Sequence, residues 1–286
     1  MSGSRASAQK KKKKKKKSAG RRVTRAERAD LFELYERSVQ APEVDVEFFD
    51  ALYVERFGES PVSLREDFCG SAALCRAWAA SSAERTAVGV DLDKETLDWA
   101  RSRLQRELGT EAERVQLTEG DVRTTGGESV DVLCAQNFSY FVFEERKELR
   151  SYFERCRERV AEPGIFIVDL FGGYESIEDE REDVTDHGDF EYVWEQHRYD
   201  PINAHGIYKI HFRFPDGSTL LDAFVYEWRL WTIPEVRELM LEAGFAAADV
   251  YWEDEDPDTG EGLGSYSLQT SAACDPAWNA YVVGRR

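Results

Sequence analysis

The segment from Leu64 to Asp91 constrains the fold more than any other part of the chain. It reads as a short extended run, a turn of small residues at Cys69-Gly70-Ser71, a helical run, and an apolar strand that ends on Asp91. This order predicts a strand–turn–helix–strand unit with a carboxylate directly after its second strand. In such a unit the backbone approaches a ligand closely at the turn, and the carboxylate can accept both hydroxyls of a ribose. The segment therefore favours a nucleotide-like ligand.

Two classes of cofactor fit this unit, the dinucleotides and S-adenosylmethionine. A dinucleotide site requires Gly-x-Gly-x-x-Gly, because the pyrophosphate lies against the helix N-terminus. The corresponding run, residues 68–72, is Phe-Cys-Gly-Ser-Ala and holds a single glycine. S-adenosylmethionine has no phosphate, so the turn has only to pass close to its methionine part and ribose. The turn favours S-adenosylmethionine, and an NAD(P)-dependent oxidoreductase is the alternative.

Four further segments continue the pattern along the chain. They are Gly120-Asp121-Val122, the strand-like run 130–135, the run 136–140 (Gln-Asn-Phe-Ser-Tyr), and the strand-like run 165–169 after a Pro-Gly turn. In order and spacing, residues 61–169 resemble the successive motifs of class I S-adenosylmethionine-dependent methyltransferases, and the likeness resumes over residues 232–245. The resemblance implies an α/β fold with a seven-stranded, mostly parallel, Rossmann-like sheet. The chain departs from the family at residues 66–72, where Glu-Asp-Phe-Cys-Gly-Ser-Ala replaces acidic-x-Gly-x-Gly-x-Gly.

The resemblance also assigns cofactor-binding residues. Asp91 is expected to accept hydrogen bonds from the ribose hydroxyls, with a plain surface carboxylate as the alternative, and Gly70 to allow close backbone approach. Glu66 matches the family's acidic position, which orients the turn or reaches the donor's amino group through water. Asn137, beyond the fourth strand, is expected to touch cofactor as well as substrate.

The adenine is assigned to residues that follow the second and third strands. Asp121 matches the position whose carboxylate accepts a hydrogen bond from the adenine amine, and the backbone amide of Val122 is expected to reach a ring nitrogen. The alternative for Asp121 is a turn-forming residue after Gly120. Leu92 is expected to flank the adenine.

Few residues of this class carry the chemistry, because methyl transfer from a sulfonium is an in-line displacement on an activated donor. Asn137 and Tyr140 are the candidate catalytic residues. Their run has a faint similarity to the Asn-Pro-Pro-Tyr motif of amino-group methyltransferases, although the prolines are missing. The four histidines fall between residues 187 and 211, and one of them could act as a general base. No pair has helical metal-ligand spacing, so the sequence predicts no metal site.

Charge is divided sharply along the chain. Residues 1–28 hold thirteen lysines and arginines against one glutamate, a net charge of +12. Because the whole chain has a net charge of −18, residues 29–286 carry −30. An acidic body repels phosphate backbones, which disfavours nucleic acid as a substrate of the core. The basic run Lys10–Lys17 is expected either to contact anionic surfaces or to be a disordered extension without a partner.

Patterning divides the chain into five parts: a disordered polybasic tail (1–25), an N-terminal helical cap (26–60), a Rossmann-like cofactor core (61–171), an antiparallel β lid over the substrate (172–231), and a C-terminal completion of the core (232–286). The antiparallel sheet is predicted from three segments with period-two alternation, 190–197, 207–214 and 219–231, and the resemblance to methyltransferases implies that it forms a lid over the substrate. Tyr35 of the cap and Trp194 and Tyr208 of the lid are the candidate substrate-binding residues.

The sequence thus predicts an enzyme that transfers a methyl group from S-adenosylmethionine to nitrogen or oxygen of a small molecule. A non-catalytic methyltransferase-like module that binds an anionic partner through the basic tail is a further alternative. No apolar run reaches the ~20 residues of a membrane span, and no apolar run follows the basic N-terminus as in a secretory signal. Five scattered cysteines without a C-x-x-C pair favour a reducing, cytoplasmic location. The sequence does not indicate an oligomeric state.

Overall fold

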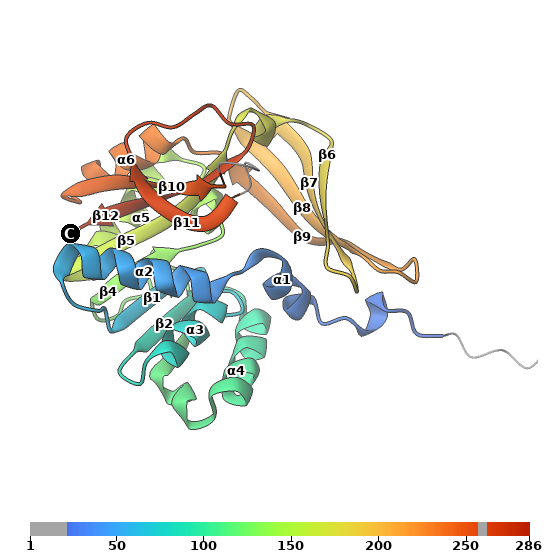
Figure 1. The fold of residues 1–286 in the computed structure, drawn as a ribbon, viewed down its shortest axis with the longest axis horizontal. Coiled ribbons are helices and arrows are strands. Elements are labelled where there is room, and N and C mark those ends of the chain that lie inside the picture. The colour runs from blue at the N-terminus through green and yellow to red at the C-terminus, as the bar shows by residue number, and fades with distance from the viewer. Residues whose placement is uncertain (1–21, 257–261) are drawn as a thin grey trace, which may run out of the picture.

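The computed structural model describes residues 22–256 and 262–286, and these form a large mixed sheet covered by helices with a second sheet beside it (Figure 1). The strands of the large sheet are β1 (Ser63–Asp67), β2 (Thr86–Asp91), β3 (Val115–Glu119), β4 (Val130–Ala135), β5 (Val160–Gly172), β10 (Ala247–Glu255), β11 (Gly262–Gln269) and β12 (Trp278–Arg285). The strands of the second sheet are β6 (Arg181–Asp186), β7 (Glu191–Asp200), β8 (His205–Arg213) and β9 (Thr219–Arg229). The predicted fold class is confirmed.

The large sheet has the order β11-β10-β12-β5-β4-β1-β2-β3. Strands β1 to β5 pair in parallel, whereas β12 lies antiparallel between β5 and β10. The sheet has eight strands instead of the predicted seven. The additional strand, β11, pairs antiparallel with β10 at the edge of the sheet. Its run of glycine and serine residues shows no clear apolar alternation, so the sequence pattern did not indicate a strand there.

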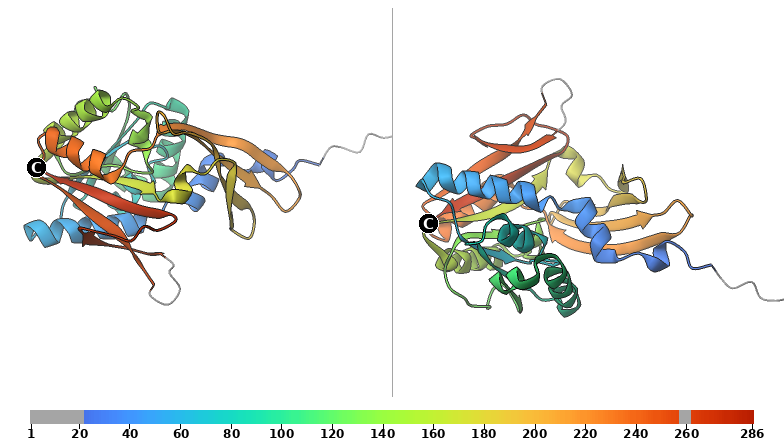
Figure 2. Two further views of the ribbon diagram at one scale, coloured as in Figure 1. Left: turned by 90° about the horizontal axis from the view of Figure 1, so that it is seen from above. Right: turned by 60° about the horizontal axis from the view of Figure 1, so that its bottom comes forward.

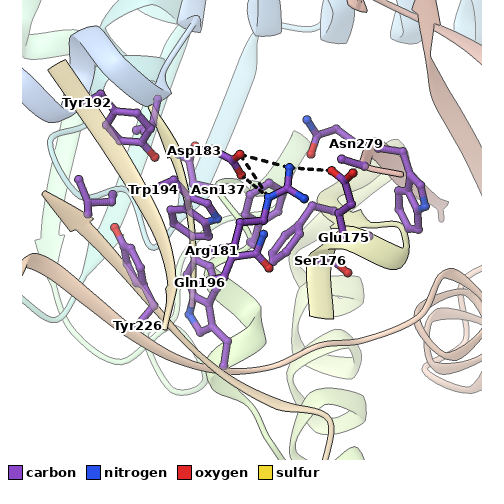
Figure 3. Close-up of a pocket in the computed structure, with 18 of the residues that line it drawn as sticks. Asn137, Glu175, Ser176, Arg181, Asp183, Tyr192, Trp194, Gln196, Tyr226 and Asn279 are labelled. Carbon is purple, nitrogen blue, oxygen red and sulfur yellow. Dashed lines mark hydrogen bonds and ion pairs between the residues drawn. The ribbon is translucent and has the colours of Figure 1, made fainter. Parts of the chain in front are cut away.

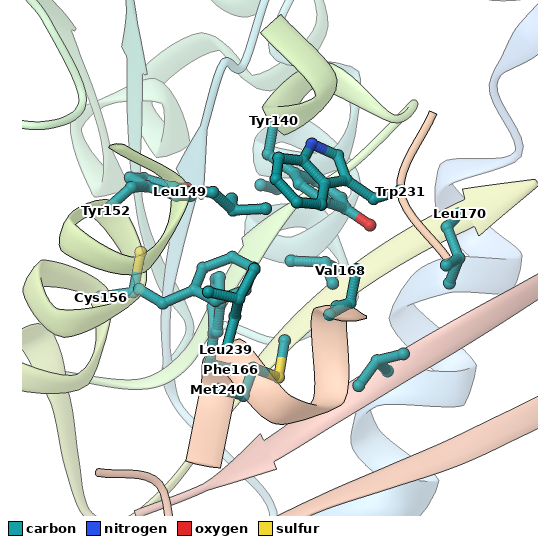
Figure 4. Close-up of a cluster of buried hydrophobic side chains, with 14 of the residues drawn as sticks. Tyr140, Leu149, Tyr152, Cys156, Phe166, Val168, Leu170, Trp231, Leu239 and Met240 are labelled. Carbon is teal, nitrogen blue, oxygen red and sulfur yellow. The ribbon is translucent and has the colours of Figure 1, made fainter. Parts of the chain in front are cut away.

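Helices cover both faces of the large sheet. The helices are α1 (Leu31–Val39), α2 (Pro42–Phe57), α3 (Ala73–Ser81), α4 (Lys94–Leu108), α5 (Arg146–Arg159) and α6 (Ile233–Glu242), with short 3-10 turns η1 (Ala26–Arg28), η2 (Gly109–Arg114), η3 (Ser139–Val142) and η4 (Tyr174–Ile177). On one face, α2, α3 and α4 share a core cluster with the strands, and on the other face α5 and α6 do. Figure 4 shows the second cluster, in which Leu149, Phe166 and Met240 are fully buried. The central strands are apolar toward both layers, as a sheet buried on both faces requires.

The second sheet projects from the carboxyl end of β5 and has α1 against it (Figure 2). Leu34 of α1 packs with Phe190, Ile210 and Phe212 of this sheet in a separate small core. The sequence predicted three strands here, and the structure adds β6 at the edge. This strand, with the sequence Arg-Glu-Asp-Val-Thr-Asp, is largely exposed, so it lacks the apolar alternation from which strands are recognised.

The chain returns from the second sheet to the large one through a capped helix start. The Thr232 side chain accepts a hydrogen bond from the backbone amide of Glu235, and the Glu235 carboxylate accepts one from the amide of Thr232, which forms a capping box. No helix within the described residues has the length and apolar character needed to cross a membrane. Four of the five cysteines are buried, and all five are free thiols.

Thr232→Ala is expected to lower the free energy of unfolding by about 1 kcal/mol, because the amide of Glu235 loses its acceptor at the start of α6. The measurement is urea unfolding followed by tryptophan fluorescence. Thr232→Ser keeps the hydroxyl and serves as the control. A loss of equal size in Thr232→Ser would show that the methyl group, and not the cap, stabilises this helix start.

Candidate active site

The carboxyl ends of the parallel strands form the edge of the sheet where a ligand crevice is expected. Strand β1 pairs with β2 on one side and with β4 on the other, so the connections leave β1 in opposite directions at this point. In open α/β sheets, ligands bind in the crevice outside the carboxyl ends at such a switch point. The residues that follow β1, β2, β3 and β4 therefore lie at one edge, as the sequence pattern requires.

The turn after β1 brings Gly70 onto Asp91. The backbone amide of Gly70 donates to one carboxylate oxygen of Asp91 over 2.8 Å, and the amide of Asp93 donates to the other over 2.9 Å. Gly70 has φ of +50°, and a β-carbon added there would meet nothing within 4 Å, so the turn is open on that side. Asp91 is thus held in place at the edge, with lone pairs left for a ligand.

Backbone strain is concentrated in two turns at this edge. Phe68 and Ala72, on either side of Gly70, have positive φ values of 60° and 57°, and so do Asn137 and Phe138 after β4, with 55° and 57°. Bulky residues rarely adopt this conformation, and such strain gathers at binding and catalytic sites. The sequence gives no sign of it, because none of these four residues is a glycine.

Three carboxyl groups near this edge hold their protons unusually tightly. Burial is the main cause in each case, and it raises the pKa of Glu66 to about 8, that of Asp169 on β5 to about 7, and that of Asp45 on α2 to about 6. The thiol of Cys75 donates to Glu66, and the backbone amides of Asn137 and Phe138 donate to Asp169. Their negative charges also act on one another, which adds to the rise. A cationic ligand would lower all three pKa values.

The residues assigned to the adenine lie further along the same edge. Leu92 is 68% exposed and available to a flat ligand. Arg123 binds both carboxylate oxygens of Asp121 and lowers the pKa of this carboxyl group. An adenine amine could use Asp121 only after this ion pair has opened or shifted. Val122 is buried, and its carbonyl accepts a hydrogen bond from Arg159.

A cavity of about 350 Å³ lies between this edge and the second sheet (Figure 3). Its lining comes from α1, from the large sheet and its connections, and from η4 with the second sheet. The residues are, in that order, Tyr35 and Val39; Asn137, Phe138, Phe171, Gly172, Glu253, Ala277, Trp278 and Asn279; and Glu175, Ser176, Arg181, Asp183, Tyr192, Trp194, Gln196, Ile210, Tyr226 and Trp228. We refer to it as the aromatic cavity. Its walls combine ring faces with carboxylates, a surface that suits a cationic or amine-bearing molecule.

Polar groups of the aromatic cavity differ in how far they are satisfied. The Arg181 guanidinium forms ion pairs with Glu175, Glu178 and Asp183, so its charge is neutralised within the wall (Figure 3). In contrast, the buried Oε1 atom of Gln196 has no hydrogen-bond partner among the described residues. A buried acceptor of this kind costs free energy unless a ligand donates to it. The cavity therefore offers Gln196 to a hydroxyl or amine group.

The structure brings three of the predicted substrate or catalytic residues together at this cavity. Tyr35, Asn137 and Trp194 line it, and the Tyr35 hydroxyl is hydrogen-bonded to Tyr226 of the second sheet. The predicted cofactor residues Gly70, Asp91 and Asp121 do not line the cavity and lie at the sheet edge beside it. Asn137 belongs to both regions, because it lines the cavity and its backbone amide donates a hydrogen bond to the carboxylate of Asp169.

Tyr140 and Tyr208 are corrections to the sequence prediction. Tyr140 is fully buried in the core against Phe141 and Phe153, since the left-handed turn at Phe138 directs the following 3-10 turn into the protein. Tyr208 is 1% exposed, donates a hydrogen bond to the carbonyl of Ser176, and is covered by the ring of Trp194 at 5.3 Å. Neither residue lines the aromatic cavity.

Residues that sequence analysis missed include Asp169, Gln196 and Tyr226. Asp169 ends the strand-like run after the Pro-Gly turn, and its position after four apolar residues was a usable signal. Gln196 and Tyr226 alternate with outward-facing residues on β7 and β9, and only the pairing of these strands shows which face meets the core.

One cluster outside this region resembles a metal site in composition. Glu195, His211 and Asp222 could offer ligand atoms within 4.8 Å of one another. However, Nδ1 of His211 accepts a hydrogen bond from the backbone amide of Asp222, so its Nε2 carries the proton and donates to Glu195 over 2.6 Å. Both imidazole nitrogens are therefore in use, and the cluster serves as a hydrogen-bonded link between β7, β8 and β9.

The part of the chain that forms this sheet edge is similar to a known protein family. Residues 67–168 match the family model of a methyltransferase domain. This part of the chain is a methyltransferase domain. The match includes the turn at Gly70, Asp91 and the turn at Asn137, and it confirms the resemblance to class I methyltransferases. No curated protein matches the chain.

Solved structures share the fold of the methyltransferase domain and most of the rest of the chain. An S-adenosylmethionine-dependent methyltransferase from Clostridium acetobutylicum has 15% identity, covers 89% of this chain and 96% of its own, and superposes with a TM-score of 0.63. CalS10, an amino pentose methyltransferase from Micromonospora echinaspora, has 16% identity over 90% of this chain and 98% of its own, with a TM-score of 0.63. The sugar N-methyltransferase KedS8 from Streptoalloteichus has 16% identity over 90% of this chain and 93% of its own, with a TM-score of 0.59.

Proposed function

We propose that this methyltransferase domain transfers the methyl group of S-adenosylmethionine to the nitrogen of a small, amine-bearing acceptor bound in the aromatic cavity. The observation that carries the proposal is the place of this cavity, which opens at the carboxyl ends of β4 and β5 through Asn137, Phe138 and Phe171. The cofactor crevice defined by Gly70 and Asp91 meets the same edge of the sheet. A donor in the crevice and an acceptor in the cavity would therefore face each other.

The charges at this edge support S-adenosylmethionine as the donor. It carries a sulfonium and an ammonium group, and the three buried carboxyls Glu66, Asp169 and Asp45 lie where positive charge is stabilised. Asp91 offers a fixed carboxylate for the ribose hydroxyls. In the dinucleotide alternative, the turn 68–72 would have to hold a pyrophosphate with one glycine.

Nitrogen is favoured over oxygen because of the walls of the aromatic cavity. Glu175 and Asp183 pair with the guanidinium of Arg181, and Glu253 adds a third carboxylate, so the lining is acidic overall. The rings of Trp194, Tyr226 and Trp228 face the same space. Such a wall attracts an amine as a cation and still packs on its neutral form. One of the solved structures with this fold is a sugar N-methyltransferase, which agrees with a nitrogen acceptor.

The reaction is a single displacement. The nitrogen lone pair attacks the methyl carbon, the carbon–sulfur bond breaks, and the products are S-adenosylhomocysteine and a methylated ammonium that later loses its proton to solvent. Asn137 has a left-handed backbone, and its backbone amide is bonded to Asp169. Its side-chain oxygen is thereby positioned to accept a hydrogen bond from the amine and so to orient the nitrogen lone pair. The second sheet and α1 act as a lid that keeps water from the donor.

The test of this function is methyl transfer to matched pairs of acceptors. We expect S-adenosylhomocysteine to form at least tenfold faster with glucosamine than with glucose, and with 2-phenylethylamine than with 2-phenylethanol, because only the amines use the carboxylates of the cavity. Mass spectrometry of the products identifies the methylated atom. Transfer to the alcohol members would contradict nitrogen as the acceptor. Binding of NAD(P) in place of S-adenosylmethionine would favour the oxidoreductase alternative.

A further inference from the structure

A second cavity lies next to the aromatic cavity and shares Trp278 with it. Its volume is about 490 Å³, and four residues line both cavities: Phe171, Gly172, Ser176 and Trp278. The two spaces are therefore adjacent and share part of their lining. We refer to the second one as the apolar cavity.

The shared lining depends on a close approach of Trp278 to Gly172. A β-carbon at Gly172 would come within 2.2 Å of the Trp278 ring, so only glycine allows the ring to lie across the strand end. Trp252 supports the ring from behind with a centroid distance of 5.0 Å. The Trp278 ring thus contributes to the lining of both cavities, and a ligand that occupied both would run along it.

The lining of the apolar cavity offers little to a polar ligand. Ile177, Ile233, Trp252 and Ala273 contribute apolar surface. Three of its polar side chains are already engaged: Thr232 and Glu235 hydrogen-bond to each other in the capping box, and the Ser176 hydroxyl donates to the carbonyl of Gly173. A cavity of this kind favours an apolar occupant, because these three side chains keep their hydrogen bonds when the occupant enters.

Arg229 is the positively charged side chain in the lining of the apolar cavity. Its guanidinium lies over the Trp231 ring at 3.7 Å and donates to the carbonyl of Glu144 and the carboxylate of Glu235. Only its Nε has no hydrogen-bond partner among the described residues. Its charge is compensated by Glu235, so Arg229 does not turn the cavity into an anion site.

We propose that the apolar cavity binds an aryl or alkyl part of the same acceptor whose amine lies in the aromatic cavity. This inference rests on the proposed function, since it assigns the acceptor a polar reacting end and an apolar extension. Cavities of ~150 Å³ can hold a benzene ring, so about 490 Å³ is sufficient for a ring and several methylene groups. The substrate class that follows is an amine with a hydrophobic appendage.

The experiment compares primary amines that differ in their apolar tail. Propylamine and 6-phenylhexylamine are titrated into the full chain saturated with S-adenosylhomocysteine, and binding is followed by tryptophan fluorescence and calorimetry. In the wild type, 6-phenylhexylamine is expected to bind at least tenfold more tightly than propylamine, because burial of the tail removes its apolar surface from water.

Two variants alter only the apolar cavity. Ile177→Asp places a charge in its wall, and Ala273→Phe fills part of its volume; both positions are exposed, so the substitutions do not disturb the core. Ile202→Asp and Ala246→Phe carry the same changes at exposed positions that line neither cavity. We expect the advantage of the long amine to fall below threefold in the first two variants and to persist in the two controls.

The proposal is wrong if 6-phenylhexylamine gains no affinity over propylamine in the wild type, or if Ile177→Asp and Ala273→Phe keep the full gain. It is also wrong if the long amine binds too weakly to measure. Failure of the proposed function has a different signature, because S-adenosylhomocysteine then does not bind, or methyl transfer to amines is absent, irrespective of the tail. Affinity for propylamine is expected to be equal in all five proteins.

Discussion

Asp91→Ala is expected to weaken the binding of S-adenosylhomocysteine about a hundredfold. Each hydrogen bond from a hydroxyl to a carboxylate contributes about 1.5–3 kcal/mol, so loss of the ribose pair costs at least about 3 kcal/mol, which corresponds to a hundredfold loss of affinity or more. The variant also leaves the amide of Gly70 without its 2.8 Å acceptor, so the turn after β1 loses its fixed position. The measurement is calorimetric titration at constant salt.

Asp93→Ala is the matched control for this prediction. Asp93 lies two residues beyond Asp91, and its carboxylate caps α4 through the amide of Thr96 over 2.7 Å. Both variants remove one negative charge from the same strand end, and both lose a hydrogen bond to a backbone amide. We expect Asp93→Ala to change the affinity less than threefold. Equal losses in the two variants would refute Asp91 as the ribose acceptor, because the effect would then come from charge or local unfolding.

Glu66→Gln is expected to remove much of the pH dependence of folding stability between pH 5.5 and 8.5. Burial raises the pKa of Glu66 from 4.5 to about 8 in the folded protein, so folding takes up a proton between these two values. The stability associated with this group is fully present below pH 4.5 and is lost as the pH rises toward 8. Each pKa unit is worth 1.36 kcal/mol, so the wild type should lose about 2–4 kcal/mol more than the variant over this interval.

The measurement is urea unfolding at pH 5.5, 7.0 and 8.5 in the absence of cofactor. Glutamine keeps an acceptor for the Cys75 thiol, so the variant is expected to be more stable than the wild type at pH 8.5. A residual slope from Asp169, with a pKa of about 7, should remain in both proteins. Glu113→Gln, at an exposed position, is the control and should follow the wild type. Parallel curves for wild type and Glu66→Gln would show that this carboxyl is ionised in the folded protein at neutral pH.

The order of the strands around the cofactor crevice could be predicted from the sequence because it depends on local signals. The small-residue turn at Gly70, the apolar strand before Asp91 and the capped helix after Thr232 each occupy a short stretch of chain. Hydrophobic periodicity and turn chemistry act over such stretches, so the residues alone indicate them. The resemblance to class I methyltransferases then supplied the global topology.

Charges inside the core could not be predicted from the same patterns. Arg65 and Asp67 lie on β1 with exposed fractions of 1% and 0%, although their residue types indicate a solvated strand end. Arg65 donates to Asp67 over 2.8 Å and to the carbonyls of Thr125 and Gly126, and Tyr152 also donates to Asp67. Apart from the pair itself, these partners come from two other parts of the chain. Only the assembled sheet shows that the pair is compensated and can be buried.

The sequence by itself therefore determined the class of fold, the turn at Gly70 with its carboxylate at Asp91, and the existence of an aromatic second sheet. The tertiary structure decided which aromatic residues reach the aromatic cavity: Trp194 faces it, whereas Tyr208 lies beneath that ring and Tyr140 lies in the core. The physical reason is that a cavity is formed by residues far apart in the chain, such as Tyr35, Asn137 and Trp278. Periodicity assigns a side chain to a face of its own strand, but the packing of sheet on sheet decides whether that face is filled or left open.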